Sequence, residues 1–321
     1  MDKLMKVLLV SNVYPVNDHT GTPSIGIQQR LLEEQGVQFE VLPIATGSMM
    51  AYFRTGVRFL LMNFQPPQYD LIHAYYGLSV FLSILQRKIP VLGTFLGSDL
   101  INKSNSSDRD RILGRFAARH ADQVIVMSEE MKLASGRNDA WVIPFGVDTS
   151  EFHRIEQQEA RRQLGLHPKR KYILFPWNPA RGVKRFDIIE ECMELLKPIY
   201  SDIELAVIYD RPHAEVMLYM NACDVMVLAS DHEGSPVAVR EALACELPVV
   251  SVDVGDVKDL LGTTFNSVIV ERDPAAFAEA ICKLLEQGKE NVRQNTKEPY
   301  TNLNASEKVL AVYQGILRQK H

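Results

Sequence analysis

The amino-acid sequence predicts an α/β protein with two domains, each built on a parallel β-sheet. Three observations lead to this prediction. Short apolar runs alternate with helical patterns along the whole chain, which is typical of parallel strands joined by helices. The chain has 321 residues, enough for two domains of about 150 residues each. The alternation is interrupted near the middle, where Pro144 and Gly146 occur in the segment IPFGVD.

The first domain is expected to span residues 1–148 and to begin almost at once with a strand. Short runs rich in Val, Leu and Ile recur along it, and helical segments at 25–35 and 109–119 lie between some of them. Such runs, bounded by polar residues, are typical of buried strands. The predicted strands cover residues 6–10, 39–43, 71–74, 91–95, 123–127 and 140–143.

The second domain is expected over residues 149–300, and a polar helix at 156–164 leads into it. Only residues 209–221 lie between its second strand and the segment ACDV, residues 222–225, where its third strand begins, and we expect this stretch to hold no further strand. An amphipathic helix at 305–317 ends the pattern. The predicted strands of this domain cover residues 172–175, 204–208, 225–228, 249–252 and 268–270.

Composition excludes some kinds of partner. The 35 basic and 40 acidic residues give a formal net charge of −5, so no general attraction to nucleic acid is expected. The N-terminus lacks the pattern of a signal peptide, and no apolar run approaches the roughly 20 residues that span a bilayer. None of the four cysteines has a C-x-x-C or Cys/His metal spacing. We therefore expect a reduced, cytoplasmic protein without a bound metal or cofactor.

The most informative segment is DHEGSPVAVREALACELPVVSVDVGD, residues 231–256. Ser235 is a favoured N-cap residue and Pro236 suits a first helical position, so a helix is expected to begin at Pro236. This helix would carry Glu241 in its second turn. Gly234 lets a ligand approach the backbone closely. Glu233 lies just before the helix, eight residues from Glu241.

The start of this helix is suited to an anion. The free N–H groups near Ser235 to Val237 and the positive end of the helix dipole would face a phosphate. Flanked by the carboxylates of Glu233 and Glu241, such a phosphate cradle suits a ligand that has both phosphates and hydroxyls, as a nucleotide sugar does. The alternative is an ordinary capped helix with two solvated glutamates.

The same segment resembles the E-x7-E signature of the GT-B glycosyltransferases of family 4, known for retention of configuration at the transferred sugar. The resemblance continues through LPVV and DVGD, although the run from Cys245 to Pro248 lacks the usual glycine. IPFGVD resembles the interdomain segment I-P-N-G-V-D of the family, with Phe145 in place of Asn. The resemblance covers essentially the whole chain. It implies two Rossmann-like domains facing a cleft, with a final helix at 301–321 that packs back toward the first domain.

The turn after the first strand of the second domain carries candidate phosphate ligands. The family has an Arg and a Lys here that contact the donor diphosphate, and Lys184 in FPWNPARGVKRFD matches the Lys. Asn178 occupies the usual Arg position, so we expect Arg181 to replace it. A guanidinium can bind two phosphate oxygens at once. The alternative is a solvated basic turn.

In the first domain the resemblance points to Gly26 and Asp99. The loop at 14–27 resembles the glycine loop of the family, with Gly26 as the best match, although a flexible surface loop is the alternative. The segment TFLGSD resembles T-x-H-G-x-D, but Leu96 replaces the His that touches the sugar. Asp99 matches, and it either receives an acceptor hydroxyl or caps the next helix.

The resemblance also assigns roles. Glu241 would accept hydrogen bonds from the ribose, and Glu233 would hold hydroxyls of the donor sugar. Lys184, Arg181 and the N–H groups near Ser235 to Val237 would neutralise the diphosphate as it leaves, so no metal is implied. The acceptor would attack the face that the diphosphate leaves, which gives retention.

A basic, partly apolar surface is a further expectation for the first domain. Arginines at 109, 111, 115 and 119 lie on one predicted helix, and Arg54 and Arg58 lie among Phe59, Leu60, Leu61 and Phe64. Many family members act on lipid-linked acceptors, and an amphipathic basic helix suits peripheral contact with a membrane. The alternative is a solvated helix face.

The sequence therefore predicts a glycosyltransferase that moves a sugar from a UDP- or GDP-sugar to a carbohydrate or lipid-linked acceptor. Cell-surface polysaccharide or glycolipid synthesis is the expected context. A nucleotide-sugar epimerase of the same fold remains an alternative. A non-catalytic glycosyltransferase-like subunit is another, suggested by Leu96 and by the short segment at 209–221, which lies where the family binds the nucleotide base. A nicotinamide-dependent dehydrogenase is disfavoured because no G-x-G-x-x-G motif is present.

Overall fold

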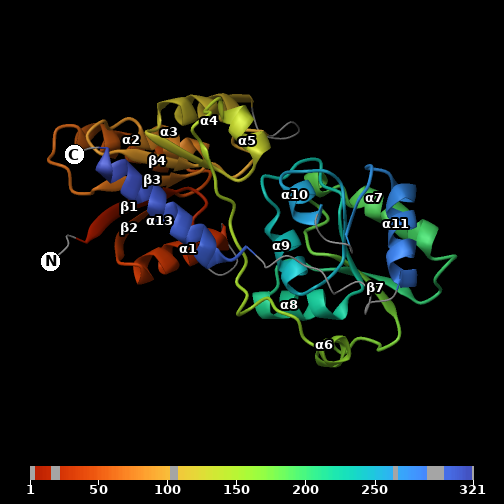
Figure 1. Cartoon of the computed structure of the whole chain (residues 1–321). Coiled ribbons are helices and arrows are strands. Elements are labelled where there is room, and N and C mark those ends of the chain that lie inside the picture. Colours follow the sequence, from red (N-terminus) through yellow and green to blue (C-terminus); the bar gives the residue numbers. More distant parts are fainter. Residues whose placement is uncertain (1–3, 16–21, 102–107, 263–266, 288–299, 320–321) are drawn as a thin grey trace. The chain divides into compact units, whose positions relative to one another are not determined.

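The computed structural model describes residues 4–15, 22–101, 108–262, 267–287 and 300–319. The chain forms two compact units, shown in Figure 1. Unit 1 contains residues 1–145 and 302–321, and unit 2 contains residues 146–301. The last helix therefore belongs to the same unit as the first strand.

Unit 1 is built on a six-stranded parallel sheet with the strand order β2-β1-β3-β4-β5-β6. The central strands are buried because their runs of Val, Leu and Ile face helices on both sides of the sheet. The strands are β1 (Met5–Ser11), β2 (Val37–Pro43), β3 (Leu71–Tyr75), β4 (Val91–Thr94), β5 (Gln123–Val126) and β6 (Trp141–Val142).

The helices of unit 1 alternate with these strands along the chain. They are α1 (Pro23–Glu34), α2 (Met49–Met62), α3 (Gly77–Ser83), α4 (Asp108–His120), α5 (Glu129–Ser135) and α13 (Asn302–Arg318). The helix α13 packs against α1, and Figure 1 shows it in blue beside the sheet of unit 1. No helix among the described residues is long and apolar enough to cross a membrane.

A buried histidine joins α13 to the sheet. The Nδ1 atom of His73 on β3 lies 2.6 Å from the hydroxyl of Tyr313 on α13, and its Nε2 atom lies 2.7 Å from Oγ1 of Thr94 on β4. Burial lowers the pKa of His73 to about 3, so the ring stays neutral at physiological pH. This histidine is a structural residue with both ring nitrogens satisfied.

Unit 2 is built on a five-stranded parallel sheet with the order β11-β10-β9-β7-β8. The strands β7, β9 and β10 form its buried centre, with Ile173, Leu174 and Phe175 fully covered. The strands are β7 (Lys171–Phe175), β8 (Ile203–Val207), β9 (Val225–Leu228), β10 (Val249–Ser251) and β11 (Val268–Ile269).

The helices of unit 2 also follow its strands in alternation. A single helix, α8, joins β8 to β9, as expected from the short segment at 209–221. The elements are α6 (Gln157–Leu164), the 3₁₀ turn η1 (Gly182–Lys184), α7 (Phe186–Leu196), α8 (His213–Ala222), α9 (Val237–Ala244), α10 (Val257–Leu261) and α11 (Pro274–Gln287).

The predicted fold class is confirmed in both sheets. All eleven strands expected from the sequence are present within two residues of their predicted bounds, and every strand pairing is parallel. Helix starts were predicted less well. The helix α1 begins at Pro23, so Gly26 lies inside the helix and not in the loop before it. Residues 16–21 of that predicted glycine loop lie outside the described residues.

Candidate functional site

Two loops meet at the carboxyl edge of the sheet in unit 2. One follows β7 and contains η1, and the other follows the neighbouring strand β9 and leads into α9. The backbone N–H of Asp231 in the second loop donates a 2.9 Å hydrogen bond to the carbonyl of Val183 in the first. Ligands of open α/β sheets bind at this edge, so the two loops form the candidate site.

The first loop and the second are also joined by an ion pair. The Nζ atom of Lys184 lies 2.5 Å from Oε1 of Glu233, and the two side chains are only 7% and 16% exposed. The hydroxyl of Ser230 donates a 2.7 Å hydrogen bond to the same carboxylate oxygen. The structure thus brings together two of the predicted site residues in a largely dry position.

An aromatic ring completes the surroundings of Lys184. Its Nζ atom lies 4.8 Å from the ring centroid of Trp177, which is within the range of a cation–π contact. Burial lowers the pKa of the Lys184 ammonium, the charge of Glu233 opposes this effect, and the charge of Arg181 adds to it. The fold therefore holds the Lys184 ammonium in place, where it could also bind the anionic group of a ligand.

Arg181 lies in the same turn but is exposed. Its backbone N–H donates to the carbonyl of Asn178, and the side chain of Asn178 accepts a 2.9 Å hydrogen bond from the N–H of Ala180. Asn178 thus shapes the turn from the position where the family has an Arg. Within the described part of the chain, no acidic side chain pairs with the guanidinium of Arg181.

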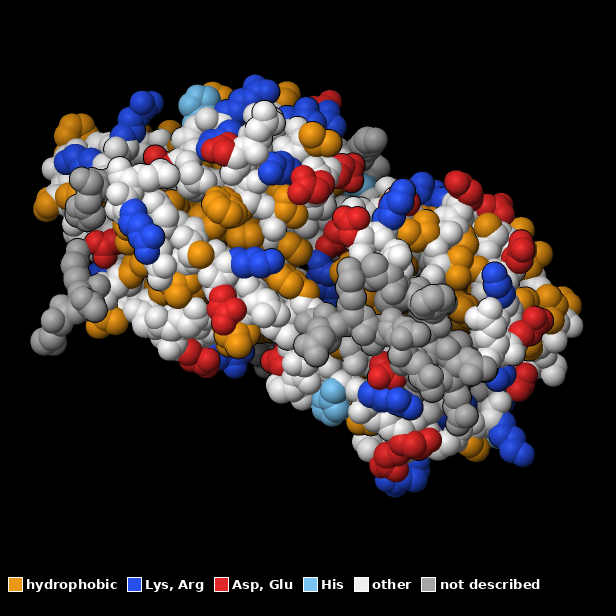
Figure 2. All heavy atoms as spheres, viewed as in Figure 1, with side chains coloured by type: hydrophobic (Ala, Val, Ile, Leu, Met, Phe, Trp, Pro, Cys, Tyr) orange, Lys and Arg blue, Asp and Glu red, His pale blue; other side chains and the backbone are white. Residues whose placement is uncertain are grey.

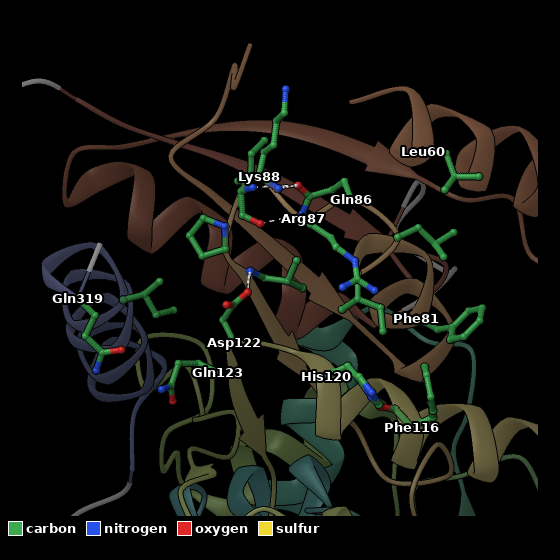
Figure 3. A pocket seen from close by; sticks show the side chains of 16 residues that line it. Leu60, Phe81, Gln86, Arg87, Lys88, Phe116, His120, Asp122, Gln123 and Gln319 are labelled. Carbon is green, nitrogen blue, oxygen red and sulfur yellow. Dashed lines mark hydrogen bonds between the residues drawn. The ribbon is translucent and has the colours of Figure 1, made fainter. Parts of the chain in front are cut away.

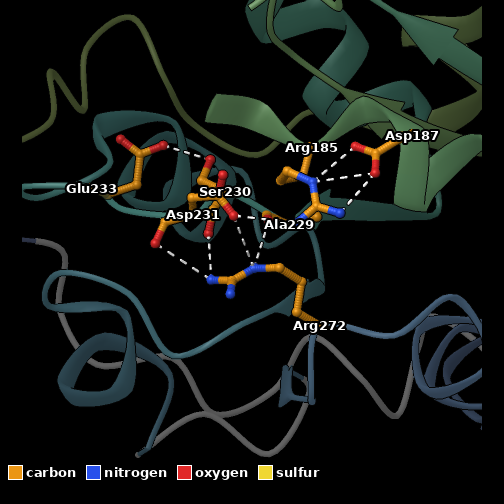
Figure 4. A network of polar contacts seen from close by, with 7 residues as sticks. All are labelled: Arg185, Asp187, Ala229, Ser230, Asp231, Glu233 and Arg272. Carbon is orange, nitrogen blue, oxygen red and sulfur yellow. Dashed lines mark hydrogen bonds and ion pairs between the residues drawn. The ribbon is translucent and has the colours of Figure 1, made fainter. Parts of the chain in front are cut away.

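A network of charged side chains supports the loop that carries Glu233, as Figure 4 shows. Arg272 donates to the carbonyls of Ala229 and Ser230 at 3.3 and 2.9 Å. Arg185 pairs with Asp187 at 2.7 Å and with Asp231 at 3.3 Å. The charge of Arg185 is therefore already engaged. Sequence reasoning did not find Arg272, because it lies 39 positions after Glu233 and no motif contains it.

The start of α9 differs from the prediction. The helix begins at Val237 with Pro236 in the N-cap position, and no side chain caps it. The hydroxyl of Ser235 instead donates to Oδ2 of Asp256 at 2.9 Å and receives a 3.2 Å hydrogen bond from Arg240. The expectation of a Ser235 N-cap was wrong because a buried ion pair between Arg240 and Asp256 attracts the hydroxyl.

The backbone of Gly234 is in close contact with the loop that follows β10. The loop after β10 contains Gly255 with φ of +59°, and a Cβ atom there would lie 2.8 Å from the carbonyl oxygen of Gly234 and 3.1 Å from that of Glu233. Only glycine allows this approach without strain. The loop at 253–256 therefore packs directly against the backbone of Glu233 and Gly234.

Glu241 lies on α9, where its carboxyl group is partly buried. Burial, followed by the charge of Glu151, raises its pKa to about 8. Among the described residues, none donates a hydrogen bond to this carboxyl group. A buried carboxyl group without donors is costly, and a ligand with hydroxyl groups would satisfy it.

Asp99 in unit 1 lies at the carboxyl edge of the other sheet but points inward. It is fully buried, and its carboxylate accepts hydrogen bonds from the backbone N–H groups of Gly97 and Gly77 at 2.9 and 3.0 Å, and from Leu96 at 3.1 Å. Burial raises its pKa to about 6. This carboxylate therefore joins the loop after β4 to the start of α3, the helix that precedes it in the chain, and its role toward an acceptor stays a prediction.

Gly26 is the other predicted residue of unit 1. A Cβ atom at this position would lie 3.3 Å from Cγ of Pro15, so glycine allows the chain after β1 to pass close to α1. Gly26 therefore shapes the segment after β1 within unit 1.

A hollow of about 910 Å³ lies in unit 1, away from the carboxyl edge of its sheet. Figure 3 shows it beside the beginnings of β4 and β5 and the ends of α4 and α13. Its lining is mixed: Leu60, Phe81 and Phe116 supply apolar surface, and Arg87 and His120 supply polar groups. No cluster of three metal-binding side chains occurs in the described ranges.

Comparison with known proteins gives matches in both halves of the chain. Residues 190–287 match the family model described as Glycosyl transferases group 1, and residues 21–151 match the model described as Glycosyltransferase Family 4. The putative teichuronic acid biosynthesis glycosyltransferase TuaC of Bacillus subtilis is 30% identical over 237 residues. This match covers 67% of the chain and 61% of the relative.

Solved structures show the same fold. The Anabaena protein Alr3699/HepE, determined in complex with UDP and glucose, has a TM-score of 0.70 at 15% identity, over 97% of this chain and 100% of that one. The UDP-GlcNAc 2-epimerase of Methanocaldococcus jannaschii has a TM-score of 0.61 at 13% identity, over 97% and 99%. At such identities the likeness establishes the GT-B fold and no more.

Proposed function

Because residues 190–287 and 21–151 of this chain match the models of group 1 and family 4 glycosyltransferases, we propose that it transfers a sugar from a nucleotide-sugar donor to a hydroxyl acceptor, with retention of configuration. The observation that carries this proposal is the buried pair of Lys184 and Glu233 at the carboxyl edge of the sheet in unit 2. A dry site that holds a cation beside a carboxylate is suited to a ligand with both a diphosphate and hydroxyl groups. A UDP- or GDP-sugar has this composition.

The residues of the proposed donor site bind different parts of the nucleotide sugar. Lys184 and Arg181 bind the diphosphate, and the backbone N–H groups of Ser235 and Val237 add positive potential at the start of α9. Glu233 accepts hydrogen bonds from hydroxyls of the donor sugar. Glu241, whose carboxyl group has no donor within the described residues, accepts them from the ribose.

The proposed chemistry needs no protein nucleophile. A hydroxyl oxygen of the acceptor forms a bond to the anomeric carbon while the bond from that carbon to the diphosphate oxygen breaks. The electron pair leaves on the diphosphate, and the hydroxyl proton passes to an oxygen of the departing diphosphate. Lys184 stabilises the growing negative charge, and such preorganised charges usually contribute more to catalysis than any other single effect.

For unit 1 we propose roles in support of the acceptor. Asp99 holds the loop after β4 through three backbone N–H groups, so its effect on an acceptor is exerted through Gly97 and Ser98. Gly26 allows the segment after β1 to lie close to α1. The relative TuaC is named for teichuronic acid biosynthesis, which supports a polysaccharide or glycolipid context for this chain.

We further propose that α2 and α4 bring unit 1 to a membrane that carries a lipid-linked acceptor. The outer face of α2 exposes Phe53, Leu60 and Leu61, and Phe64 just beyond the helix is 86% exposed. Arg54 and Arg58 lie between these residues, and α4 adds Ile112, Arg115, Phe116 and Arg119. Figure 2 shows hydrophobic and basic side chains interspersed on this part of unit 1. Apolar groups that enter the interface and arginines that attract anionic lipids are typical of peripheral binding.

Ligand-dependent stabilisation tests the donor. We expect one of UDP-, GDP- or ADP-sugars to raise the melting temperature, because a ligand that binds the native state at a hundredfold excess over Kd adds about 2.7 kcal/mol of stability. An epimerase would convert the donor without any acceptor and keep the sugar on the nucleotide, whereas a transferase releases nucleoside diphosphate only when an acceptor is present. Failure of all three donor classes to bind would argue against the proposal.

A further inference from the structure

The environment of Lys184 contains one group to which the proposed reaction gives no role. Trp177 lies two residues after the end of β7 and is partly buried, and its ring packs edge-on against Phe175 with centroids 5.4 Å apart. The face of the same ring lies 4.8 Å from the ammonium of Lys184. Lys184 is therefore held between a neutral aromatic face and the carboxylate of Glu233.

The two partners of Lys184 differ in how they respond to a ligand. Glu233 is an anion and competes with a diphosphate for the same ammonium, and its carboxylate is also the group proposed to receive sugar hydroxyls. Trp177 attracts the cation through its ring quadrupole and carries no charge, so it does not compete with the incoming phosphate. When Glu233 turns to the sugar, the ring can keep its contact with the ammonium.

We propose that Trp177 is a positioning residue for Lys184, and that its indole face holds the ammonium at the end of β7 while the donor diphosphate replaces Glu233 as the anionic partner. This inference rests on the proposed role of Lys184 as a diphosphate ligand. The indole also packs against the core of unit 2 through Phe175, which contacts Phe186 with centroids 5.0 Å apart, so the variants that test the inference keep an apolar side chain at this position.

The contact itself can be tested without any ligand. The sequence has two tryptophans, and Trp141 is an exposed residue of unit 1, so the Trp141→Phe variant leaves Trp177 as the sole indole. Deprotonation of Lys184 removes the cation from the ring and should change the emission of Trp177. We expect a step in this emission between pH 7 and 11, with its midpoint below the ordinary lysine value of 10.5.

A matched variant shows which group titrates. In Trp141→Phe combined with Lys184→Met, the ammonium is replaced by a neutral chain, and the step should disappear. Glu233 and Arg181, the charged groups that act on Lys184, are present in both variants, and the ionisation of tyrosines is common to both. A step that is unchanged in the Lys184→Met variant would overturn the proposal.

Kinetics then test whether the contact matters for the reaction. Trp177→Leu keeps an apolar side chain without a π face and should lower kcat about thirtyfold, which corresponds to one desolvated cation–π contact. Trp177→Phe, which retains a weaker π face, should fall between this variant and the wild type. Trp141→Phe is the control and should keep full activity.

The outcomes separate this inference from the proposed function. A kcat of Trp177→Leu within twofold of the control would refute a positioning role even if donors bind normally. If no nucleoside diphosphate stabilises the wild type, the proposed function fails, whereas the fluorescence titration still decides whether Trp177 holds Lys184.

Discussion

Lys184 is a residue whose chemistry depends on where the fold places it. An ammonium group in water would be solvated and mobile, but here it is 7% exposed and bonded to Glu233. Removing a charge from water is costly unless a partner compensates it, and the pair with Glu233 supplies this compensation. The partner is on another loop, so the loops must fold correctly before the site can bind anything.

Replacing the cations one at a time tests the diphosphate site. Lys184→Ala should lower kcat by on the order of a hundredfold, because its charge stabilises the departing diphosphate more than the bound donor. Arg181→Ala should act in the same direction. Steady-state kinetics at saturating donor would measure both. Near-normal turnover in Arg181→Ala with an inactive Lys184→Ala would identify Arg181 as a surface residue.

The Glu233→Gln variant tests whether Glu233 contacts the sugar or the nucleotide part of the donor. The substitution keeps the shape of the side chain and removes its charge, so turnover should fall while the affinity for free nucleoside diphosphate stays close to that of the wild type. Calorimetric titration with UDP or GDP, beside a turnover assay, provides the two values. An equal loss in both would mean that Glu233 also contacts the nucleotide.

Glu241 predicts a pH dependence. Its pKa is raised to about 8 from an ordinary value of 4.5, so the folded protein takes up a proton that the unfolded chain would release. Its contribution to stability is therefore present below about 4.5 and is lost as the pH rises through 8. The ionised form is the better acceptor for ribose hydroxyls, so nucleoside diphosphate should bind about tenfold more tightly at pH 9 than at pH 7.

The matched variant for this prediction is Glu241→Gln, which cannot ionise. Its affinity should be lower than that of the wild type by about 1.5–3 kcal/mol at high pH, and the ratio between the two proteins should change with pH. Calorimetry at several pH values gives this ratio. A constant ratio from pH 7 to 9 would remove Glu241 from the nucleotide site.

Some of these side chains could be found from the sequence and others could not. Lys184, Glu233 and Glu241 lie in short segments that resemble motifs of a known family, and this resemblance proposed their roles where spacing alone left alternatives open. Ser235 was misassigned as an N-cap because its actual partner, Asp256, is 21 positions later. Arg272 and Trp177 gain their significance only from contacts made in the folded chain.

At the scale of elements, the turn between α9 and β10 carries an unusual backbone. Glu246 has φ of +55°, a conformation in which side chains other than glycine are strained. The resemblance to the family had marked this run as lacking its usual glycine. The side chain of Glu246 lies 3.1 Å from Arg154, but the arginine is 57% exposed, and such pairs contribute little.

Glycine should therefore be preferred at this position. Glu246→Gly and Glu246→Ala both lose the pair with Arg154, but only glycine relieves the backbone, so it should be more stable than alanine by about 1 kcal/mol. Gly315 is the opposite case, because it is helical and a Cβ there would meet open space. Gly315→Ala should gain about 1 kcal/mol. Urea denaturation measures the free energy of unfolding of all these variants. A Glu246→Ala variant that is more stable than Glu246→Gly would contradict the strain argument.

The strands were predicted well and the helix starts less well for a physical reason. A buried parallel strand is a short run of apolar residues, and this run is visible in the sequence itself. A helix start depends on which side chain satisfies the first N–H groups, and at α9 a distant ion pair changed that answer. The candidate site includes the start of α9, so its local geometry could not be predicted from the sequence either.

At the scale of the molecule, the surface formed by α2 and α4 predicts binding to anionic membranes. Phe53→Ser combined with Phe64→Ser should weaken binding to vesicles that contain phosphatidylglycerol by at least about tenfold, because two large apolar side chains no longer enter the interface. Ile199→Ser in unit 2, also exposed, is the matched control. Cosedimentation with and without phosphatidylglycerol measures the effect.

Two results would contradict the proposed membrane contact. One is equal sedimentation of the wild type and the double variant. The other is binding to phosphatidylglycerol vesicles that does not weaken at high salt, because the arginines of α2 and α4 should act through screened charge interactions. A loss of binding that also occurs in Ile199→Ser would point to general aggregation.

The division of unit 1 into two pieces of sequence has a consequence for how the protein is made. The sheet of unit 1 is synthesised first, but α13, which bonds to His73 through Tyr313, emerges last. The intervening 156 residues of unit 2 take roughly 8–30 s to translate at ordinary rates. During that time α13 is not yet present, so the surface of α1 and the ring of His73 stay uncovered in the nascent unit 1. Unit 2 can meanwhile fold around its own core. The domain that begins first is thus the one that finishes last on the ribosome.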